Sequence, residues 1–225
     1  MYILRSNLYR YCVVTNESVE EWNTIIQNTM NDNPIQTYLS NDSYDSVDDP
    51  HGFLENTLRN TEILNQLNSY EIPKHILQLK GDICLLMRNV APDEGLTRNT
   101  RLRIISLGNK TVRVQKLINN HEYTIHRITF KHKLSFGRSF TMLRNQLPLT
   151  LAYAITINKS QGQEFDKVLL DLRTPCFSHG HLYVGLSRIR RPQDIQIYAT
   201  EEQIINGRLQ HTTNIVYKEL LFDEN

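Results

Sequence analysis

Cysteine is scarce in this chain of 225 residues, and long apolar runs are missing. Cys12, Cys84 and Cys176 are odd in number and far apart, which argues against a disulfide framework and favours a reducing, intracellular compartment. No apolar run approaches the roughly 18 residues of a membrane span, so we expect no membrane partner. The first ten residues hold two arginines and no apolar stretch, which is unlike a secretory signal.

Net charge is also small, at +1, but the total hides a strong segregation. Residues 101–146 contain ten basic residues and one acidic residue, a net charge of +9. Residues 15–74 contain eleven acidic and two basic residues, a net charge of −9. A basic stretch of this kind favours an anionic partner, most often nucleic acid. The alternative is that the basic side chains face water and pair with the acidic half.

A phosphate loop of the form G-x-x-x-x-G-K-[ST] is absent from the sequence. Lys110-Thr111 and Lys159-Ser160 are each preceded by asparagine and lack the upstream glycine. Residues 220–224, Leu-Leu-Phe-Asp-Glu, imitate an apolar run followed by an acidic pair, and we interpret this as coincidence. With neither Walker motif, we expect the chain not to hydrolyse ATP alone.

The apolar patterning predicts an α/β fold that is interrupted by a small all-β insert. Helices are predicted from Ser18, which has capping-box spacing to Glu21, to about Met30, and over residues 52–67 and 178–190. Residues 40–50 are predicted to form an acidic loop and residues 91–98 a second loop. The predicted strands are residues 9–14, 75–79, 83–87, 102–106, 111–115, 123–130, 136–142, 149–157, 168–172 and 195–199.

Two stretches carry most of the chemical information. Residues 154–166, AITINKSQGQEFD, form an apolar strand that ends in small polar residues, a lysine and a glycine. Such a turn can present backbone N–H groups, hydroxyls and one cation to phosphates. Residues 177–190, FSHGHLYVGLSRIR, combine an apolar helical stripe with Arg188 off the stripe. An arginine in that position can stabilise charge on a transferring phosphoryl group.

These stretches resemble the T-x-x-K-S-Q-G and Y-V-A-L-S-R motifs of superfamily-one DNA helicases of the petite-integration-frequency type, relatives of RecD and of Helitron helicase domains. Residues 81–89, GDICLLMRN, and 11–23 are similar to further segments of that family, so the resemblance covers about residues 9–200. It implies a RecA-like parallel sheet of the P-loop NTPase type, with helices. Residues 1–90 and 147–225 would form the second RecA-like domain, and residues 91–146 a basic SH3-like β-barrel insert.

The resemblance also implies roles for individual residues. Arg188 would be the catalytic arginine finger, with Gly162 and Glu164 beside it near the nucleotide. The remaining positions would contact single-stranded DNA: Thr156, Lys159, Ser160 and Gln161 in the first motif, and Arg101, Arg103, Arg113 and Lys131 in the insert. ATP and Mg²⁺ would bind only with the missing first RecA-like domain, supplied in cis or in trans, and the protein would be nuclear in a eukaryote.

Other interpretations stay open. The family usually has Gln where His181 stands and Ala where Gly185 stands; His181 adds pH sensitivity, and Gly185 costs about 1 kcal/mol of helix propensity. Lys159 to Gly162 would otherwise be an ordinary polar turn, and Arg188 a surface ion pair.

A metal site is a further possibility. Cys176, His179 and His181 lie close together in sequence, but a zinc site needs four ligands and no second Cys/His pair has matching spacing, so we predict no metal. The chain would alternatively be a stand-alone, non-catalytic nucleic-acid-binding module or an inactive transposon or viral remnant.

Overall fold

The computed structural model describes residues 10–30, 33–45, 61–67, 69–136, 138–205, 208–209, 212 and 214–216. They divide into two compact units, which are described separately. Unit 1 lies within residues 1–31 and 153–225, and unit 2 within residues 32–152. Among the helices of the described residues, none is both long and apolar enough to cross a membrane.

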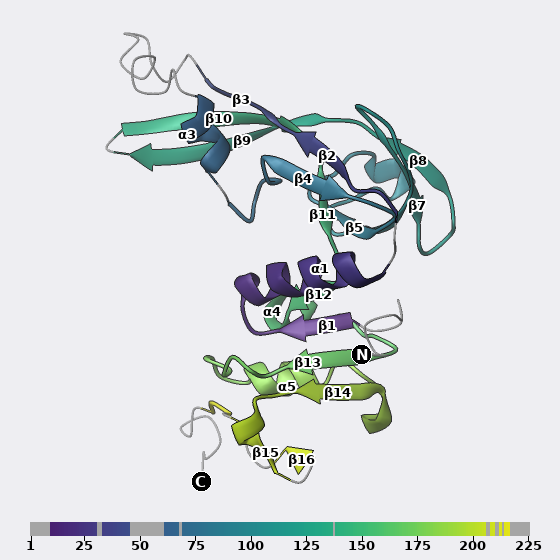
Figure 1. Cartoon of the computed structure of the whole chain (residues 1–225), viewed down its shortest axis with the longest axis vertical. Helices are drawn as coiled ribbons and strands as arrows, with labels where there is room; N and C mark the ends of the chain where they lie inside the picture. Colours follow the sequence, from purple (N-terminus) through teal and green to yellow (C-terminus); the bar gives the residue numbers. More distant parts are fainter. Residues whose placement is uncertain are drawn as a thin grey trace, which may run out of the picture. The chain divides into compact units, whose positions relative to one another are not determined.

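Unit 1 is built on a parallel sheet of four strands in the order β12-β1-β13-β14 (Figure 1). The four strands are β12 (Ala154–Thr156), β1 (Arg10–Val13), β13 (Val168–Asp171) and β14 (Ile195–Tyr198). β1 and β13 are buried along their whole length, as strands of a parallel sheet covered on both faces are. Because all four strands run the same way, their carboxyl ends meet at one edge of the sheet.

Helices cover both faces of this sheet. α1 (Asn16–Met30) lies over one face, where the side-chain amide oxygen of Asn23 accepts hydrogen bonds from the backbone N–H groups of Tyr153 and Ala154, each at 3.0 Å. The other face carries an apolar cluster that includes Cys12 and Leu170. Residues of the segments that contain α4 (Ile157–Ser160) and α5 (His181–Leu186) pack into this cluster. A short hairpin, β15 (Ile204–Ile205) and β16 (Arg208–Leu209), follows.

Unit 2 consists mainly of antiparallel strands. Its largest sheet has the order β11-β5-β6-β7-β8, and two smaller sheets pair β3-β10-β9 and β2-β4. The elements are β2 (Gln36–Leu39), β3 (Asn41–Tyr44), α3 (Thr61–Gln66), β4 (Ile76–Leu79), β5 (Ile83–Leu86), β6 (Arg101–Leu107), β7 (Val112–Lys116), β8 (Glu122–Ile125), β9 (Ile128–Phe136), β10 (Arg138–Gln146) and β11 (Leu149–Leu151).

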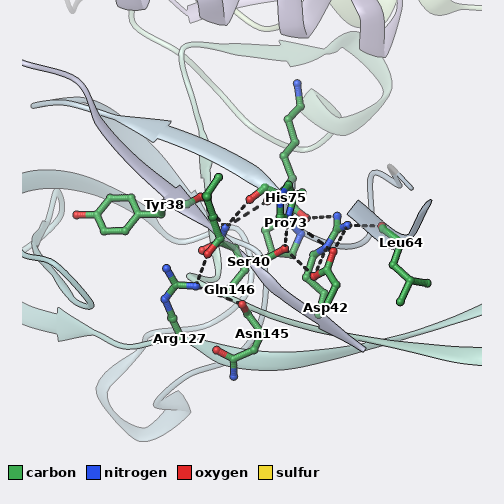
Figure 2. Close-up of polar contacts among 12 residues, drawn as sticks. Tyr38, Ser40, Asp42, Leu64, Pro73, His75, Arg127, Asn145 and Gln146 are labelled. Atoms are coloured by element: carbon green, nitrogen blue, oxygen red, sulfur yellow. Dashed lines mark hydrogen bonds and ion pairs between the residues drawn. The ribbon is translucent and has the colours of Figure 1, made fainter. Parts of the chain in front are cut away.

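A buried ion pair joins three segments of unit 2 (Figure 2). Arg144 of β10 and Asp42 of β3 both have fully buried side chains, and the Nη2–Oδ2 distance is 2.7 Å. Arg144 also donates to the carbonyl oxygens of Leu64 at 2.9 Å and Pro73 at 3.1 Å, and Ser40 donates to Asp42 at 2.6 Å. These bonds satisfy both charges in a place that water does not reach, which is the condition for a buried pair to persist.

Two predictions in the acidic half are wrong. The first helix begins at Asn16 rather than Ser18, because the Thr15 hydroxyl accepts the Ser18 N–H at 3.2 Å and so caps the helix. Residues 41–44 form β3 instead of a loop, since antiparallel pairing with β10 places Asp42 opposite Arg144. Of the predicted helix over residues 52–67, residues 52–60 lie outside the described residues, and α3 forms the rest as far as Gln66.

Three later elements also differ from prediction. Residues 149–157 form two strands in different units, β11 and β12, rather than one. Residues 123–130 are divided between β8 and β9. The helix predicted from residue 178 to residue 190 is only α5; it starts late because Gly180, at φ +68°, is outside the helical region, and it ends at Leu186. The remaining predicted strands are found with ends that shift by at most four residues.

Unit 2 is larger than the predicted insert of residues 91–146. It also contains the segment from residue 32 to residue 90, so the acidic stretch from residue 32 onward and the basic stretch lie in one unit. The described strands of unit 2 pair into three sheets, and an SH3-like barrel in this region stays a prediction.

Candidate functional site

The carboxyl edge of the parallel sheet brings the first motif next to the start of α1. Thr156 ends β12, and its hydroxyl accepts the N–H of Lys159 at 3.3 Å, which caps α4. Lys159 is exposed, and its ammonium donates to the side chain of Asn16 at 3.3 Å. The carboxyl edge of an open parallel sheet is where α/β proteins bind their ligands. Thr156, which is buried, and Lys159, which is exposed, therefore both lie at this edge.

A tight turn follows α4. Ser160 is fully buried, and its hydroxyl donates to the Ile157 carbonyl at 2.7 Å, so the structure withdraws this hydroxyl from solvent. Gln161 and Gly162 are exposed. Gly162 has φ +77°, and a Cβ atom there would have no neighbour within 4 Å, so glycine is required for its backbone conformation and not for space.

Arg188 ties the two motifs together. Its side chain is half-buried, and its Nη1 donates to the carbonyl oxygens of Ser160 at 3.2 Å and Gln163 at 2.9 Å. Nε donates to the Val184 carbonyl at 2.8 Å. These acceptors are backbone carbonyls, and Arg188 forms no ion pair with a described residue, contrary to the alternative of a surface ion pair. In this structure the guanidinium holds the turn that follows α4.

Glu164 lies on the surface, where Arg190 binds it through both carboxylate oxygens. The hydrogen bonds and charge of Arg190 hold the pKa of Glu164 below its usual range. The structure therefore brings Glu164 to Arg190, whereas Arg188 binds the carbonyls of Ser160 and Gln163.

The predicted basic residues of unit 2 lie on two different sheets. Arg101 and Arg103 are on β6 and Arg113 is on β7, and they alternate with the buried positions of those strands. Arg103 is exposed, while Arg113 pairs with Glu122 at 2.5 Å. Burial lowers the pKa of Arg101. Lys131 is exposed on β9, which belongs to the three-stranded sheet, so the structure does not place it beside the other three.

The two departures from the family motif are both buried. His181 is 1% exposed, both of its ring nitrogens lack a hydrogen-bond partner among the described residues, and burial lowers its pKa. At Gly185 a Cβ atom would lie 2.9 Å from Leu170, so α5 packs against β13 more closely than an alanine would permit without a shift.

The cysteines have the environment of core residues. Burial raises the pKa of Cys12 to about 11 and also raises the pKa values of Cys84 and Cys176, so all three thiols are protonated at neutral pH. A metal ligand must be a thiolate. Within the described part of the chain, no group of three His, Cys, Asp or Glu side chains is arranged to hold a metal ion.

One polar cluster at the carboxyl edge was missed by the sequence analysis. Asp171, the last residue of β13, accepts a 2.7 Å hydrogen bond from the indole N–H of Trp22 and a 2.7 Å bond from Arg173. Glu21 contacts the same guanidinium at 3.3 Å. These residues are spread over 152 positions of sequence, and only the packing of α1 on the sheet brings them together.

Comparison with known proteins finds similarity to DNA helicases. The model of the UvrD-like helicase C-terminal domain matches residues 151–191, the stretch that holds both motifs. The ATP-dependent DNA helicase Pif1 of Campylobacter jejuni is 47% identical over 57 residues, which is 25% of this chain and 12% of the relative. The mouse ATP-dependent DNA helicase PIF1 is 34% identical over 134 residues, 58% of this chain and 20% of the relative.

The chain resembles the C-terminal half of a Pif1-type helicase. A crystal structure of Bacteroides Pif1 bound to ssDNA has a TM-score of 0.66 at 23% identity, and covers 96% of this chain and 44% of its own. A second Bacteroides Pif1 structure, in complex with ADP-AlF3 and ssDNA, has a TM-score of 0.65 at 20% identity, with coverage of 97% and 46%. These likenesses confirm the predicted RecA-like fold class. The chain spans less than half of these Pif1 chains and about a fifth or less of these two curated Pif1 relatives.

Proposed function

We propose that this chain is the part of an ATP-dependent 5′→3′ DNA helicase that supplies single-strand contacts and an arginine finger. The observation that carries the proposal is Arg188, which binds the backbone of the turn at residues 160–163 and so joins the two Pif1-like motifs. The similarity to Pif1 helicases supports the activity, and the lack of a phosphate loop in the sequence supports its dependence on another domain.

Single-stranded DNA is the partner that the exposed groups favour. Lys159 at the carboxyl edge of unit 1 and the exposed Gln161 would contact its phosphates, while Thr156, which is buried, would act by capping α4. Arg101, Arg103, Arg113 and Lys131 would add backbone contacts from unit 2. Ser160 would act by holding the turn, because its hydroxyl is buried. The basic segment, at +9, would draw the anionic strand toward the protein.

ATP and Mg²⁺ would require a first RecA-like domain in cis or in trans. When a partner site holds the nucleotide, ATP supplies the phosphoryl group, and the role of Arg188 is to bring a fixed positive charge to it. Arg188 would then exchange its bonds to the Ser160 and Gln163 carbonyls for phosphate oxygens. Gly162, at positive φ, would let the turn accommodate that exchange. Glu164 would act near the nucleotide only after release from Arg190.

The simplest test measures binding of a fluorescent single-stranded oligonucleotide by anisotropy at several salt concentrations. We expect Lys159→Ala to weaken binding and to reduce the slope of log K against log salt by about 0.7, the value of one phosphate contact on a single strand. Lys167→Ala is the matched control, because Lys167 precedes β13 and so lies at the amino end of the same sheet. Equal losses in both variants, or salt-independent binding, would contradict the assignment.

The stand-alone binding module is the second candidate, and the exposed Arg103 and Lys131 favour it. It makes the same binding predictions for unit 2 but gives Arg188 no role in ATP turnover. The two proposals therefore differ in the effect expected of Arg188→Ala on ATP turnover.

A further inference from the structure

The carboxyl end of β14 carries an exposed tyrosine next to the polar cluster of Asp171. Asp171 pairs with Tyr198 in the register of β13 and β14, so both side chains lie on the face of the sheet that α1 covers. Trp22 of α1 packs edge-on to Tyr198 with ring centroids 5.7 Å apart, and Tyr11 lies 4.9 Å from Trp22. A row of aromatic rings therefore runs from the core to the surface and ends at Tyr198, which is 45% exposed.

Arg173 fixes the outer part of this row. Its guanidinium lies 4.8 Å from the ring centroid of Tyr198 and 5.6 Å from that of Trp22. Asp171 binds the same guanidinium with both carboxylate oxygens, and Glu21 binds it from α1. Tyr198 is thus a rigid, partly exposed ring whose position does not depend on a ligand.

The chemistry of this surface selects one kind of occupant. Two carboxylates, Asp171 and Glu21, surround the one guanidinium, so the surroundings disfavour a phosphate group. A neutral, planar group that stacks on an aromatic ring or an arginine is the occupant that fits, and a nucleobase has both properties. Tyr198 also lies on the same sheet edge as Lys159, three strands away, or ~14 Å at ~4.8 Å per strand. That span corresponds to about four stacked nucleotides at ~3.4 Å each.

We propose that Tyr198, backed by Arg173, is a stacking platform for one base of the single strand whose phosphates meet the edge at Lys159. The inference rests on the proposed function. The platform extends the proposed function, because the contacts proposed so far are with phosphates. Tyr198 would add an uncharged contact with a base. Base stacking tolerates all sequences, so the platform would strengthen binding without reading sequence.

The test compares oligothymidylate with an oligonucleotide of equal length made of abasic residues. We expect Tyr198→Ala to weaken binding of oligothymidylate about tenfold, the size of one base–aromatic stack, and to leave binding of the abasic strand unchanged. The salt slope stays at the wild-type value, because no phosphate contact is lost. Tyr198→Phe keeps the wild-type affinity, and Tyr198→Leu, which retains apolar bulk for folding, behaves as Tyr198→Ala.

Tyr183→Ala is the matched control, because Tyr183 is 73% exposed but lies on α5, which packs on the opposite face of the sheet. Trp22 is the single tryptophan of the chain, so its emission reports independently on occupation of the platform. We expect oligothymidylate to change that emission and the abasic strand not to. Equal loss of both strands in Tyr198→Ala, or no loss, overturns the platform while leaving the Lys159 result intact. Absence of binding by the wild type overturns both proposals.

Discussion

At the scale of single residues, His181 is a titratable side chain that lies in the core of unit 1. Its residue is 1% exposed and neither ring nitrogen has a hydrogen-bond partner among the described residues, so its surroundings favour the neutral imidazole. The sequence analysis expected pH sensitivity here from the residue type alone. The structure gives the reason, which is burial beside Phe177, whose ring centroid lies 5.1 Å away.

His181 predicts how stability depends on pH. Burial lowers its pKa in the folded state, so below the ordinary value of about 6.5 the unfolded chain binds a proton that the folded chain does not. The free energy of unfolding therefore falls as pH drops from 7.5 to 5.5, with a slope from this group of at most about 1.4 kcal/mol per pH unit. We expect His181→Gln to show a shallower fall in urea denaturation.

The other histidines provide the internal control. His75 and His132 lie 3.7 Å and 3.5 Å from carboxylates, and both are present in the wild type and in His181→Gln. Parallel pH profiles for the wild type and His181→Gln would show that His181 gains a proton in the folded state as easily as in the unfolded state, contrary to its burial.

At the scale of elements, the Arg144–Asp42 pair holds the segment between α3 and β4 against β3 and β10. Arg144→Met leaves Asp42 as an uncompensated buried charge, and we expect a loss of about 3–5 kcal/mol in the free energy of unfolding. Arg144→Met with Asp42→Leu removes both charges and should recover most of that loss. Urea denaturation followed by circular dichroism measures both variants. A double variant as unstable as the single one would contradict the charge-based explanation.

The helices and strands that could be predicted are those specified by a pattern of neighbouring residues in the sequence. β1 and β13 were predicted because short, continuous apolar runs mark buried parallel strands. β3 could not be, because Asn41 to Tyr44 are turn-forming residues that become a strand only through pairing with β10, about 100 residues later. The late start of α5 follows from a backbone angle at Gly180 that the sequence does not display.

The candidate site also contains residues that a contiguous motif marks and residues that only the fold brings together. Thr156, Lys159 and Arg188 were singled out because each lies in a contiguous motif that resembles a known family, and their roles stay predictions. The cluster of Trp22, Asp171 and Arg173 escaped, since its members come from α1 and from the segment after β13 and carry no motif. The turn at residues 160–163 was expected, but its attachment to Arg188 through backbone carbonyls was not.

At the scale of the whole molecule, the segregated charge acquires a structural meaning. Residues 32–74 and 101–146 belong to the same unit, and Arg144 and Asp42 neutralise one another inside it. The alternative of internal pairing thus holds for that pair, while Arg103 and Lys131 remain exposed and available for an anionic partner. Unit 1 supplies the Pif1-like motifs, so the proposed DNA contacts are divided between the two units.

The central claim is that Arg188 acts on a nucleotide held by another domain, and ATP turnover tests it most directly. The measurement joins this chain to a first RecA-like domain with a phosphate loop and follows DNA-stimulated phosphate release. We expect Arg188→Ala to lower turnover by about 10³-fold, the effect of losing an arginine finger, with little change in oligonucleotide affinity, because Thr156 caps α4 without help from Arg188. Arg188→Lys keeps the positive charge but replaces the guanidinium, so its ATP turnover shows whether the geometry of the arginine matters. Unchanged turnover in Arg188→Ala, or ATP hydrolysis by the chain alone, would contradict the account.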